Sequence, residues 1–365
     1  MSHPYLLTPG PLTTSARTKA AMLDDWGSWD KAFNQLTASI CHDLLKISNA
    51  SSRHVCVPLQ GSGTFAVEAA LGTLTFPESV VLVPVNGAYS QRIVTILQRL
   101  KRRYVVVQGP EKSPISFDVI SQILDENPLI THLAIVHCET GTGVLNPLQS
   151  ITELARGRGV EVIVDAMSSF GALPIDLSQL DLLALISASG KCLEGVPGMG
   201  FVITREESLL AARGNSSSLA LDLTDQWTYL QKTGQWRFTP PTHVVAALAE
   251  ALNQYWAEGG QPARHSRYSE MCTRLVRKMS DLGIHSYLAP EYQAPIIVTF
   301  LAPPSPAYSF QRLYKIVRQR GYILYPGKLT EIETFRIGCI GAIDGAVIDG
   351  AVSAVQHALQ EMGVL

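Results

Sequence analysis

The chain has 365 residues, of which 46% are hydrophobic and 16% are charged, and its formal net charge is −2. This composition is typical of a folded globular protein of one large or two smaller domains, and it excludes a chain that is disordered for lack of apolar residues. The densest basic cluster, Lys101-Arg102-Arg103, is short, so no basic stripe for nucleic acid is expected.

Short apolar runs alternate with amphipathic stretches through the first part of the chain. The runs are rich in Val, Ile and Leu and predict buried strands at residues 80–85, 104–107, 132–137, 160–164, 182–186 and 200–203. The stretches between them have helical apolar spacing at 65–75, 90–101, 116–126 and 148–158. Apolar strands that alternate with helices form a sheet covered on both faces, so we expect an α/β fold with a mainly parallel, doubly wound sheet.

The pattern changes after about residue 240. Two long helical stretches, 243–258 and 264–281, are followed by short strands and further helices at 295–300, 309–321, 323–325, 335–338 and the C-terminal end. This succession predicts a smaller α+β unit. We therefore place a large domain at residues 15–255 and a small domain at residues 256–365, which the N-terminal arm 1–14 joins.

Cysteine and histidine usage bears on compartment and metal binding. The six cysteines are scattered without a Cys-x-x-Cys pair, which is typical of a reducing compartment. The N-terminus lacks a signal-peptide pattern, and no stretch reaches the roughly 18 apolar residues of a membrane span. The histidines occur singly. We expect a cytoplasmic protein with no membrane segment and no dedicated metal site.

Candidate polar groups lie before one predicted helix and after two of the predicted strands, and ligands of open α/β sheets bind beyond the carboxyl ends of the strands. Gln60-Gly61-Ser62-Gly63-Thr64 precedes a helix and can cradle an anion, although it matches neither the P-loop nor the dinucleotide fingerprint. Asp165 ends an apolar strand, and Lys191 follows the next one. Read alone, these groups are a turn, a turn-capping carboxylate and a surface lysine.

Taken together, the three groups meet the requirements of pyridoxal phosphate. A lysine forms its Schiff base, a carboxylate keeps its pyridine nitrogen protonated, and a cradle binds its phosphate. Tyr89, after another strand, is placed to stack on the ring or to belong to the core.

The chain resembles the class V aminotransferases of fold type I from end to end, and within them the branch that acts on 2-aminoethylphosphonate and pyruvate. The stretches that carry the resemblance are 6–14, 60–72, 86–89, 137–143, 164–171, 191–198, 235–243, 325–328 and 335–338. Asp-Ala-Met-Ser-Ser-Phe-Gly at 165–171 and Trp-Arg-Phe-Thr-Pro-Pro-Thr-His at 236–243 point to the phosphonate branch. The resemblance implies a large domain with a mainly parallel sheet, a smaller C-terminal α+β domain and transamination chemistry.

The resemblance also implies a set of cofactor-binding residues, which are Ser62, Gly63, Thr64, Tyr89, Thr140, Asp165, Lys191 and Thr242. Among these, Lys191 and Asp165 would be the catalytic pair, and Thr140 would lie near the ring hydroxyl. Thr242 would bind the phosphate held by the other subunit, which implies a homodimer with active sites at the subunit interface.

The substrate residues implied by the resemblance are Arg336, for the anionic group, and Thr8 and Gly10 in the arm that lines the pocket. Two positions depart from the family pattern. Gly141 stands where relatives carry Thr or Ser, and Gly190 stands before the lysine where relatives often carry a polar side chain. Both departures bear on cofactor affinity and reaction specificity more than on fold.

Three alternatives stay open. An alanine:glyoxylate or serine:pyruvate aminotransferase would share every cofactor residue. A cysteine desulfurase would usually carry His where Gly190 stands and would need a mobile cysteine, for which Cys339 is a weak candidate. A non-enzymatic protein that binds pyridoxal phosphate or a nucleotide for interaction would not need the set of Lys191, Asp165 and Arg336.

Overall fold

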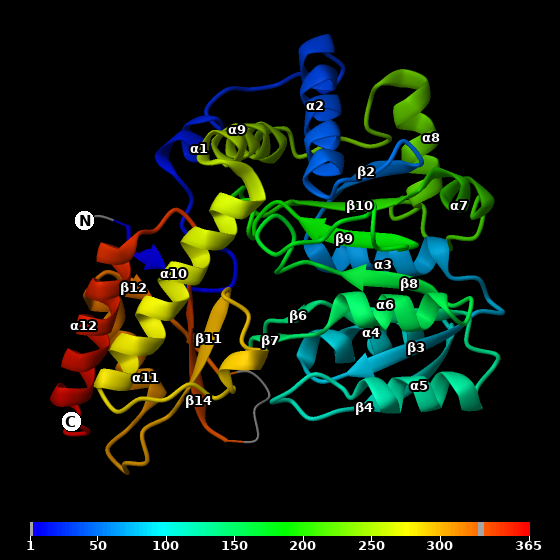
Figure 1. Cartoon of the computed structure of the whole chain (residues 1–365). Coiled ribbons are helices and arrows are strands. Elements are labelled where there is room, and N and C mark those ends of the chain that lie inside the picture. Colours follow the sequence, from blue (N-terminus) through cyan, green and yellow to red (C-terminus); the bar gives the residue numbers. More distant parts are fainter. Residues whose placement is uncertain (1–2, 328–331) are drawn as a thin grey trace.

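The computed structural model describes residues 3–327 and 332–365 and contains a central seven-stranded sheet (Figure 1). Its strand order is β2-β10-β9-β8-β5-β3-β4. These strands are β2 (His54–Gln60), β3 (Val80–Val85), β4 (Arg103–Gln108), β5 (His132–Val136), β8 (Glu161–Asp165), β9 (Ala184–Ala188) and β10 (Met199–Arg205). The strands from β9 to β4 run parallel, whereas β10 is antiparallel to both of its neighbours. The prediction of a mainly parallel sheet is confirmed.

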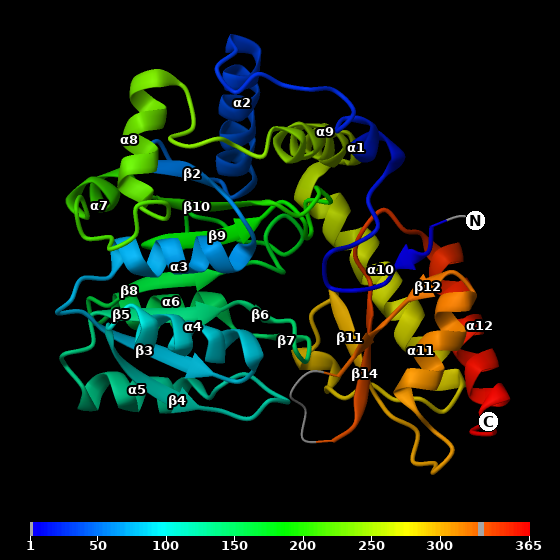
Figure 2. The same ribbon diagram turned by 180° about the vertical axis from the view of Figure 1, so that it is seen from behind.

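Helices cover both faces of this sheet, as the two opposite views show (Figures 1 and 2). One face packs against α2 (Lys31–Ile47), α5 (Phe117–Glu126), α6 (Leu148–Arg156) and α9 (Thr242–Glu258). The other packs against α3 (Gly63–Leu74), α4 (Ala88–Arg99), α7 (Glu206–Ala211) and α8 (Leu223–Thr233). Successive side chains of a strand enter opposite cores: Leu82 lies in the first, and Val81 and Val83 lie in the second. This arrangement is a doubly wound sheet.

The C-terminal part contains a three-stranded antiparallel sheet, β11-β14-β13. Its strands are β11 (Ile297–Leu301), β13 (Tyr325–Pro326) and β14 (Thr334–Gly338), and its helices are α10 (Gly260–Asp281), α11 (Phe310–Gln319) and α12 (Gly345–Glu361). β11, β14 and the three helices share a third apolar core. The division near residue 255 stays a prediction.

The N-terminal arm lies against this C-terminal part. β1 (Tyr5–Leu6) pairs in parallel with β12 (Tyr322–Ile323), and α1 (Ala16–Ala20) follows the arm. The remaining short elements are β6 (Cys138–Glu139), β7 (Val144–Leu145) and the 3₁₀ helix η1 (Pro290–Tyr292). Lys328, in one of the stretches that carry the resemblance, lies outside the described residues.

The structure adds elements that the apolar pattern did not predict, among them β2, α2, α7 and α8. β2 contains Pro58, which weakens a strand pattern, and it is tolerated because β2 forms the edge of the sheet. β9 begins at Ala184 rather than at Leu182. Across residues 3–327 and 332–365, no helix has the length and apolarity to span a membrane, and no group of three or more His, Cys, Asp or Glu is placed to hold a metal ion.

Candidate active site

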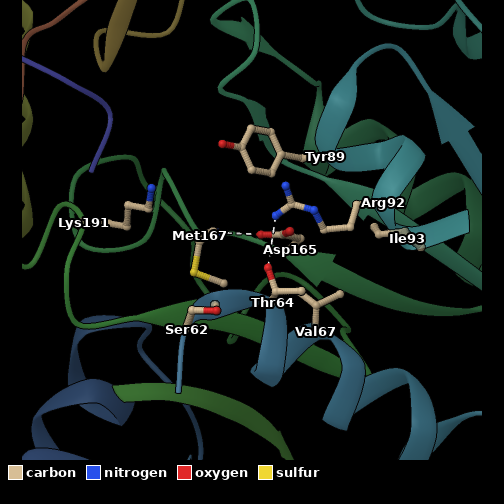
Figure 3. Close-up of a pocket in the computed structure, with 10 residues that line it drawn as sticks. Ser62, Thr64, Val67, Tyr89, Arg92, Ile93, Asp165, Met167 and Lys191 are labelled. Atoms are coloured by element: carbon tan, nitrogen blue, oxygen red, sulfur yellow. Dashed lines mark hydrogen bonds between the residues drawn. The ribbon is translucent and has the colours of Figure 1, made fainter. Parts of the chain in front are cut away.

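A cavity of about 190 Å³ lies beyond the carboxyl ends of β8 and β9 (Figure 3). Its lining comes from α3, α4 and the segments that follow β8 and β9. The lining residues are Ser62, Gly63, Thr64, Val67, Tyr89, Arg92, Ile93, Asp165, Met167 and Lys191. The structure thus brings together Ser62, Gly63, Thr64, Tyr89, Asp165 and Lys191, which the sequence analysis singled out.

One end of the cavity is suited to an anion. Ser62 is the N-cap of α3, yet its hydroxyl makes no capping bond to the helix. The guanidinium of Arg92 donates from Nη1 to Oγ1 of Thr64 at 3.0 Å, so a full positive charge lies beside the helix N-terminus. A Cβ on Gly63 would lie 2.3 Å from Sδ of Met167, so a larger residue there would require the Met167 side chain to move. The helix dipole and the guanidinium both favour a negative group.

Asp165 ends β8, and its side chain is buried, with the residue 7% exposed. Burial raises its pKa to about 6, and this effect is opposed by the N–H of Met167 and by the charges of Lys191 and Arg92. The Met167 N–H donates to Oδ1 at 2.9 Å (Figure 3). A buried carboxylate of this kind is stabilised by a cationic or N–H partner in the cavity.

Lys191 faces the cavity from the loop after β9, on the side opposite Arg92 (Figure 3). Its Nζ donates to the backbone carbonyl of Pro9 at 2.9 Å. A Cβ on Gly10 would lie 2.7 Å from Cδ and 2.8 Å from Nζ of Lys191. The arm therefore contacts this lysine directly, and the contact requires a glycine.

Arg336 and Thr140 are brought together beside the cavity but do not line it. Arg336 lies on β14 and donates from Nη1 to the carbonyl of Thr140 at 2.8 Å and from Nε to the carbonyl of Pro326 at 2.9 Å. Burial lowers the pKa of Arg336. The Thr140 hydroxyl lies 3.2 Å from the hydroxyl of Ser168. These bonds fix the guanidinium and join β14 to the loop after β5.

The two predicted threonines at the ends of this set lie elsewhere. Thr8 is buried in the arm, where its hydroxyl donates to the carbonyl of Pro11. Thr242 is the first residue of α9. Within the described chain neither lines the cavity.

Comparison with known proteins identifies the family. Residues 19–321 match the family described as aminotransferase class-V, which is most of the chain. The chain belongs to the class V aminotransferases. The resemblance read from the sequence is therefore confirmed.

Two relatives are similar over nearly their full length, and both are named 2-aminoethylphosphonate–pyruvate transaminase. The protein from Pseudomonas entomophila is 58% identical over 362 residues, covering 99% of this chain and 98% of the relative. The protein from Burkholderia ambifaria is 59% identical over 364 residues, covering 100% of this chain and 98% of the relative.

The fold is shared with solved aminotransferase structures. The alanine–glyoxylate aminotransferase from Nostoc sp. superposes with a TM-score of 0.91 at 24% identity, covering 98% of this chain and 96% of that structure. At this identity the likeness concerns the fold alone, and it confirms the predicted fold type I architecture.

Sequence reasoning missed Arg92 and Glu139. Arg92 lies three residues after Tyr89, so the two share one face of α4, and the guanidinium lies 4.8 Å from the ring centroid. This spacing was a usable signal. Glu139 is buried, and its carboxylate accepts from the N–H groups of Tyr89 at 3.0 Å and of Ser90 at 3.1 Å, at the start of α4. An acidic residue in an apolar segment was the signal there.

The two glycines that depart from the class V pattern have different surroundings. A Cβ on Gly190 would lie 3.0 Å from N and 3.1 Å from Cα of Pro197, so the loop packs closely at this position. The N–H of Gly141 donates to Oε1 of Glu139 at 3.3 Å. Gly141 therefore contributes its backbone to the same buried carboxylate that caps α4.

Proposed function

We propose that this chain catalyses the pyridoxal phosphate-dependent transfer of the amino group of 2-aminoethylphosphonate to pyruvate, giving phosphonoacetaldehyde and L-alanine. The observation that carries the proposal is the full-length similarity to proteins named 2-aminoethylphosphonate–pyruvate transaminase. The convergence of Lys191, Asp165 and the α3 cradle on one cavity supports it.

The cavity fits pyridoxal phosphate in the order of its chemical groups. The N-terminus of α3, with Ser62, Thr64 and Arg92, suits the phosphate. Asp165 is the carboxylate for the ring nitrogen, and Tyr89 offers an aromatic face. When bound, the cofactor supplies a ring that accepts the electron pair released from the substrate carbon.

Lys191 has two tasks in this proposal. Its Nζ would hold the cofactor, and as a neutral amine the same Nζ would take up and return the proton of the substrate carbon. The Pro9 carbonyl, which accepts from Nζ at 2.9 Å, limits where the amine can lie. Asp165 holds a proton at the ring nitrogen, which keeps the ring electron-poor.

Arg336 serves as the anion site for both substrates. One pocket has to accept a phosphonate in the first half-reaction and a carboxylate in the second, and a guanidinium can bind either in bidentate fashion. The carbonyls of Thr140 and Pro326 orient the side chain. Two of its five N–H donors serve these carbonyls, and further donors remain for the substrate.

The proposal includes a cytoplasmic homodimer in which Thr242 binds the phosphate held by the partner subunit. A large apolar side chain next to the cradle supports a covered surface there: Phe65, on α3, is 50% exposed. All six cysteines of the described chain are unpaired, as expected in a reducing compartment.

The test is a set of separate half-reactions. Protein loaded with pyridoxal phosphate is mixed, without keto acid, with 2-aminoethylphosphonate, alanine, serine or cysteine, and the absorbance of the lysine-bound cofactor is followed. Loss of the band with 2-aminoethylphosphonate and its return with pyruvate is the expected result. If only the α-amino acids remove the band, the phosphonate assignment is wrong; if no band forms, the cofactor assignment is wrong.

A further inference from the structure

The loop that carries Lys191 contains a residue in an unfavourable backbone conformation. Glu194 has a φ of 60°, in the left-handed region that favours glycine. Its N–H donates to the carbonyl of Lys191 at 2.8 Å, so this conformation closes the turn directly behind the lysine. A non-glycine residue persists in this conformation when its surroundings hold it there.

The side chain of Glu194 is held at two points by α10. Its Oε1 accepts from the hydroxyl of Tyr268 at 2.6 Å and from Nη2 of Arg267 at 2.6 Å. All three residues are at least partly buried, and Tyr268 is fully so. The same helix also holds the loop backbone, because Nη1 of Arg264 donates to the carbonyl of Cys192.

The two arginines are themselves fixed by a second carboxylate. Glu258, at the end of α9, accepts from Nε of Arg264 at 2.8 Å and from Nε of Arg267 at 2.7 Å. Two guanidinium groups thus lie between two carboxylates, with directed hydrogen bonds on each side. Buried pairs of this kind are better understood as setting position than as adding stability.

This cluster also reaches the N-terminal arm. Arg267 donates from Nη1 to the carbonyl of Gly341 at 2.7 Å, and the N–H of Gly341 donates to the hydroxyl of Tyr268 at 3.2 Å. The next residue, Ala342, donates its N–H to the carbonyl of Thr13 in the arm at 2.8 Å. The arm contacts Lys191 through Pro9. Both neighbours of Lys191, its own loop and the arm, are therefore connected to the same side chains of α10.

We propose that Glu194, held by Tyr268 and Arg267, is a positioning residue for Lys191. It fixes the turn behind the lysine so that Nζ points into the cavity at the place where the cofactor is attached. This inference rests on the proposed attachment of pyridoxal phosphate to Lys191. Glu194 itself does not line the cavity.

The test separates capture of the cofactor by Lys191 from its initial binding. Full-length protein is freed of cofactor and mixed with increasing pyridoxal phosphate in a stopped-flow spectrometer. The limiting rate at saturation reports the formation of the bond to Lys191, and the half-saturating concentration reports initial binding.

The variants are Glu194→Gly, which removes the carboxylate but also relieves the unfavourable φ, and Tyr268→Phe, which removes one hydroxyl. Asp349→Asn is the control, because it breaks an ion pair of 2.6 Å with Arg274 of α10 far along the helix from this loop.

We expect the limiting rate of Glu194→Gly to fall by at least about tenfold, because misplacing a reacting group by about 1 Å costs up to about 100-fold. Its half-saturating concentration should stay within about twofold of the wild-type value. The limiting rate of Tyr268→Phe should lie between the rates of Glu194→Gly and wild type. The control Asp349→Asn should match wild type. Hydrogen exchange of residues 192–196 in the protein as isolated should quicken in Glu194→Gly.

A limiting rate of Glu194→Gly equal to that of wild type would overturn the inference alone, even where exchange quickens, because the carboxylate would then be structural only. A wild-type protein that never forms the lysine-bound band would instead overturn the proposed function together with this inference.

Discussion

The Nζ of Lys191 donates a hydrogen bond of 2.9 Å to the carbonyl of Pro9, a residue 182 positions earlier in the chain. The arm is thereby part of the wall of the site rather than a peripheral extension. Gly10 lies against the same side chain, and Gly338 of β14 approaches the arm so closely that a Cβ there would lie 2.5 Å from the carbonyl oxygen of Thr8. The position of Lys191 therefore depends on how the arm is seated.

Gly10→Ala should damage both stability and activity. The residue has a φ of 118°, and an added Cβ would meet the lysine side chain at 2.7 Å. We expect a loss of about 1–3 kcal/mol in the free energy of unfolding from the backbone strain. We also expect kcat to fall by about 100-fold because Nζ is displaced. Urea unfolding and steady-state kinetics measure the two effects.

Gly283→Ala is the matched control for this prediction. Gly283 also has a positive φ, of 75°, but an added Cβ would meet no atom within 4 Å. It should lose about 1 kcal/mol of stability, as a left-handed residue with a Cβ does, and keep its kcat. Equal kcat values for the two variants would contradict a role of the Gly10 contact in placing Lys191.

Arg92→Ala should weaken binding of pyridoxal phosphate. Arg92 donates to Thr64 at the α3 N-terminus and lies over the ring of Tyr89. A hydrogen bond to a charged group contributes about 1.5–3 kcal/mol, so the Kd of the cofactor should rise by about 10- to 100-fold. Fluorescence titration measures it. Arg99→Ala, an exposed change at the last residue of α4, should leave the Kd unchanged, and a Kd of Arg92→Ala within twofold of wild type would remove Arg92 from the phosphate site.

The sequence allowed prediction of the residues that follow strands. Asp165 and Lys191 were identified because the change from apolar to polar residues marks where a buried strand ends. The carboxyl ends of parallel strands then meet at one edge of a sheet. The turn at residues 61–64 was identified because glycines before a helix have a local signature. Each of these inferences needs a short stretch of sequence and the topology of one sheet.

Contacts between distant segments were beyond such reasoning. Arg336 and Thr140 meet across 196 positions through a side chain and a backbone carbonyl, and a carbonyl has no residue signature. Glu139 caps α4 from another strand, so its partner was not visible in its own neighbourhood. The positive φ of Glu194 arises from contacts with α10 and not from its residue type. Tertiary packing rather than local preference determines these positions.

Asp165→Asn should change the pH dependence of stability in the cofactor-free protein. The pKa of Asp165 is about 6 in the folded chain, above its ordinary value of 3.8. The folded state therefore binds a proton at this site more tightly than the unfolded state, so its contribution to stability is full below about pH 4 and is lost as the pH rises through 6. Wild type should lose about 1 kcal/mol relative to Asp165→Asn between pH 5 and pH 7.5. Urea unfolding at both pH values measures the difference.

Adding the cofactor should reverse the effect of the Asp165 carboxylate on stability at pH 7.5. A protonated ring nitrogen beside the carboxylate favours its charged form, so bound pyridoxal phosphate should stabilise wild type more than Asp165→Asn at pH 7.5. Glu153→Gln, on the outer surface of α6, serves as the control and should leave both curves unchanged. If wild type and Asp165→Asn kept the same stability difference with and without cofactor, Asp165 would not be the partner of the ring nitrogen.

Arg336→Ala should raise the KM for 2-aminoethylphosphonate and for pyruvate together, by about 10- to 100-fold each, because both anions lose the same charged hydrogen bonds. Arg336→Lys should recover only part of the loss, since an ammonium cannot pair with two oxygens in a fixed fork. Steady-state kinetics with each substrate varied in turn measures this, with the exposed Arg318→Ala on α11 as the control.

The bonds from Arg336 to the carbonyls of Thr140 and Pro326 give a second way for this substitution to act. If the arginine served only to join β14 to the loop after β5, its loss would lower kcat and stability while leaving both KM values near those of wild type. If it binds substrate, the two KM values rise in parallel, whereas Ser168→Ala, in the segment after β8, removes only the hydroxyl contact to Thr140 and leaves both KM values unchanged. A rise in KM for one substrate alone would contradict a shared anion site.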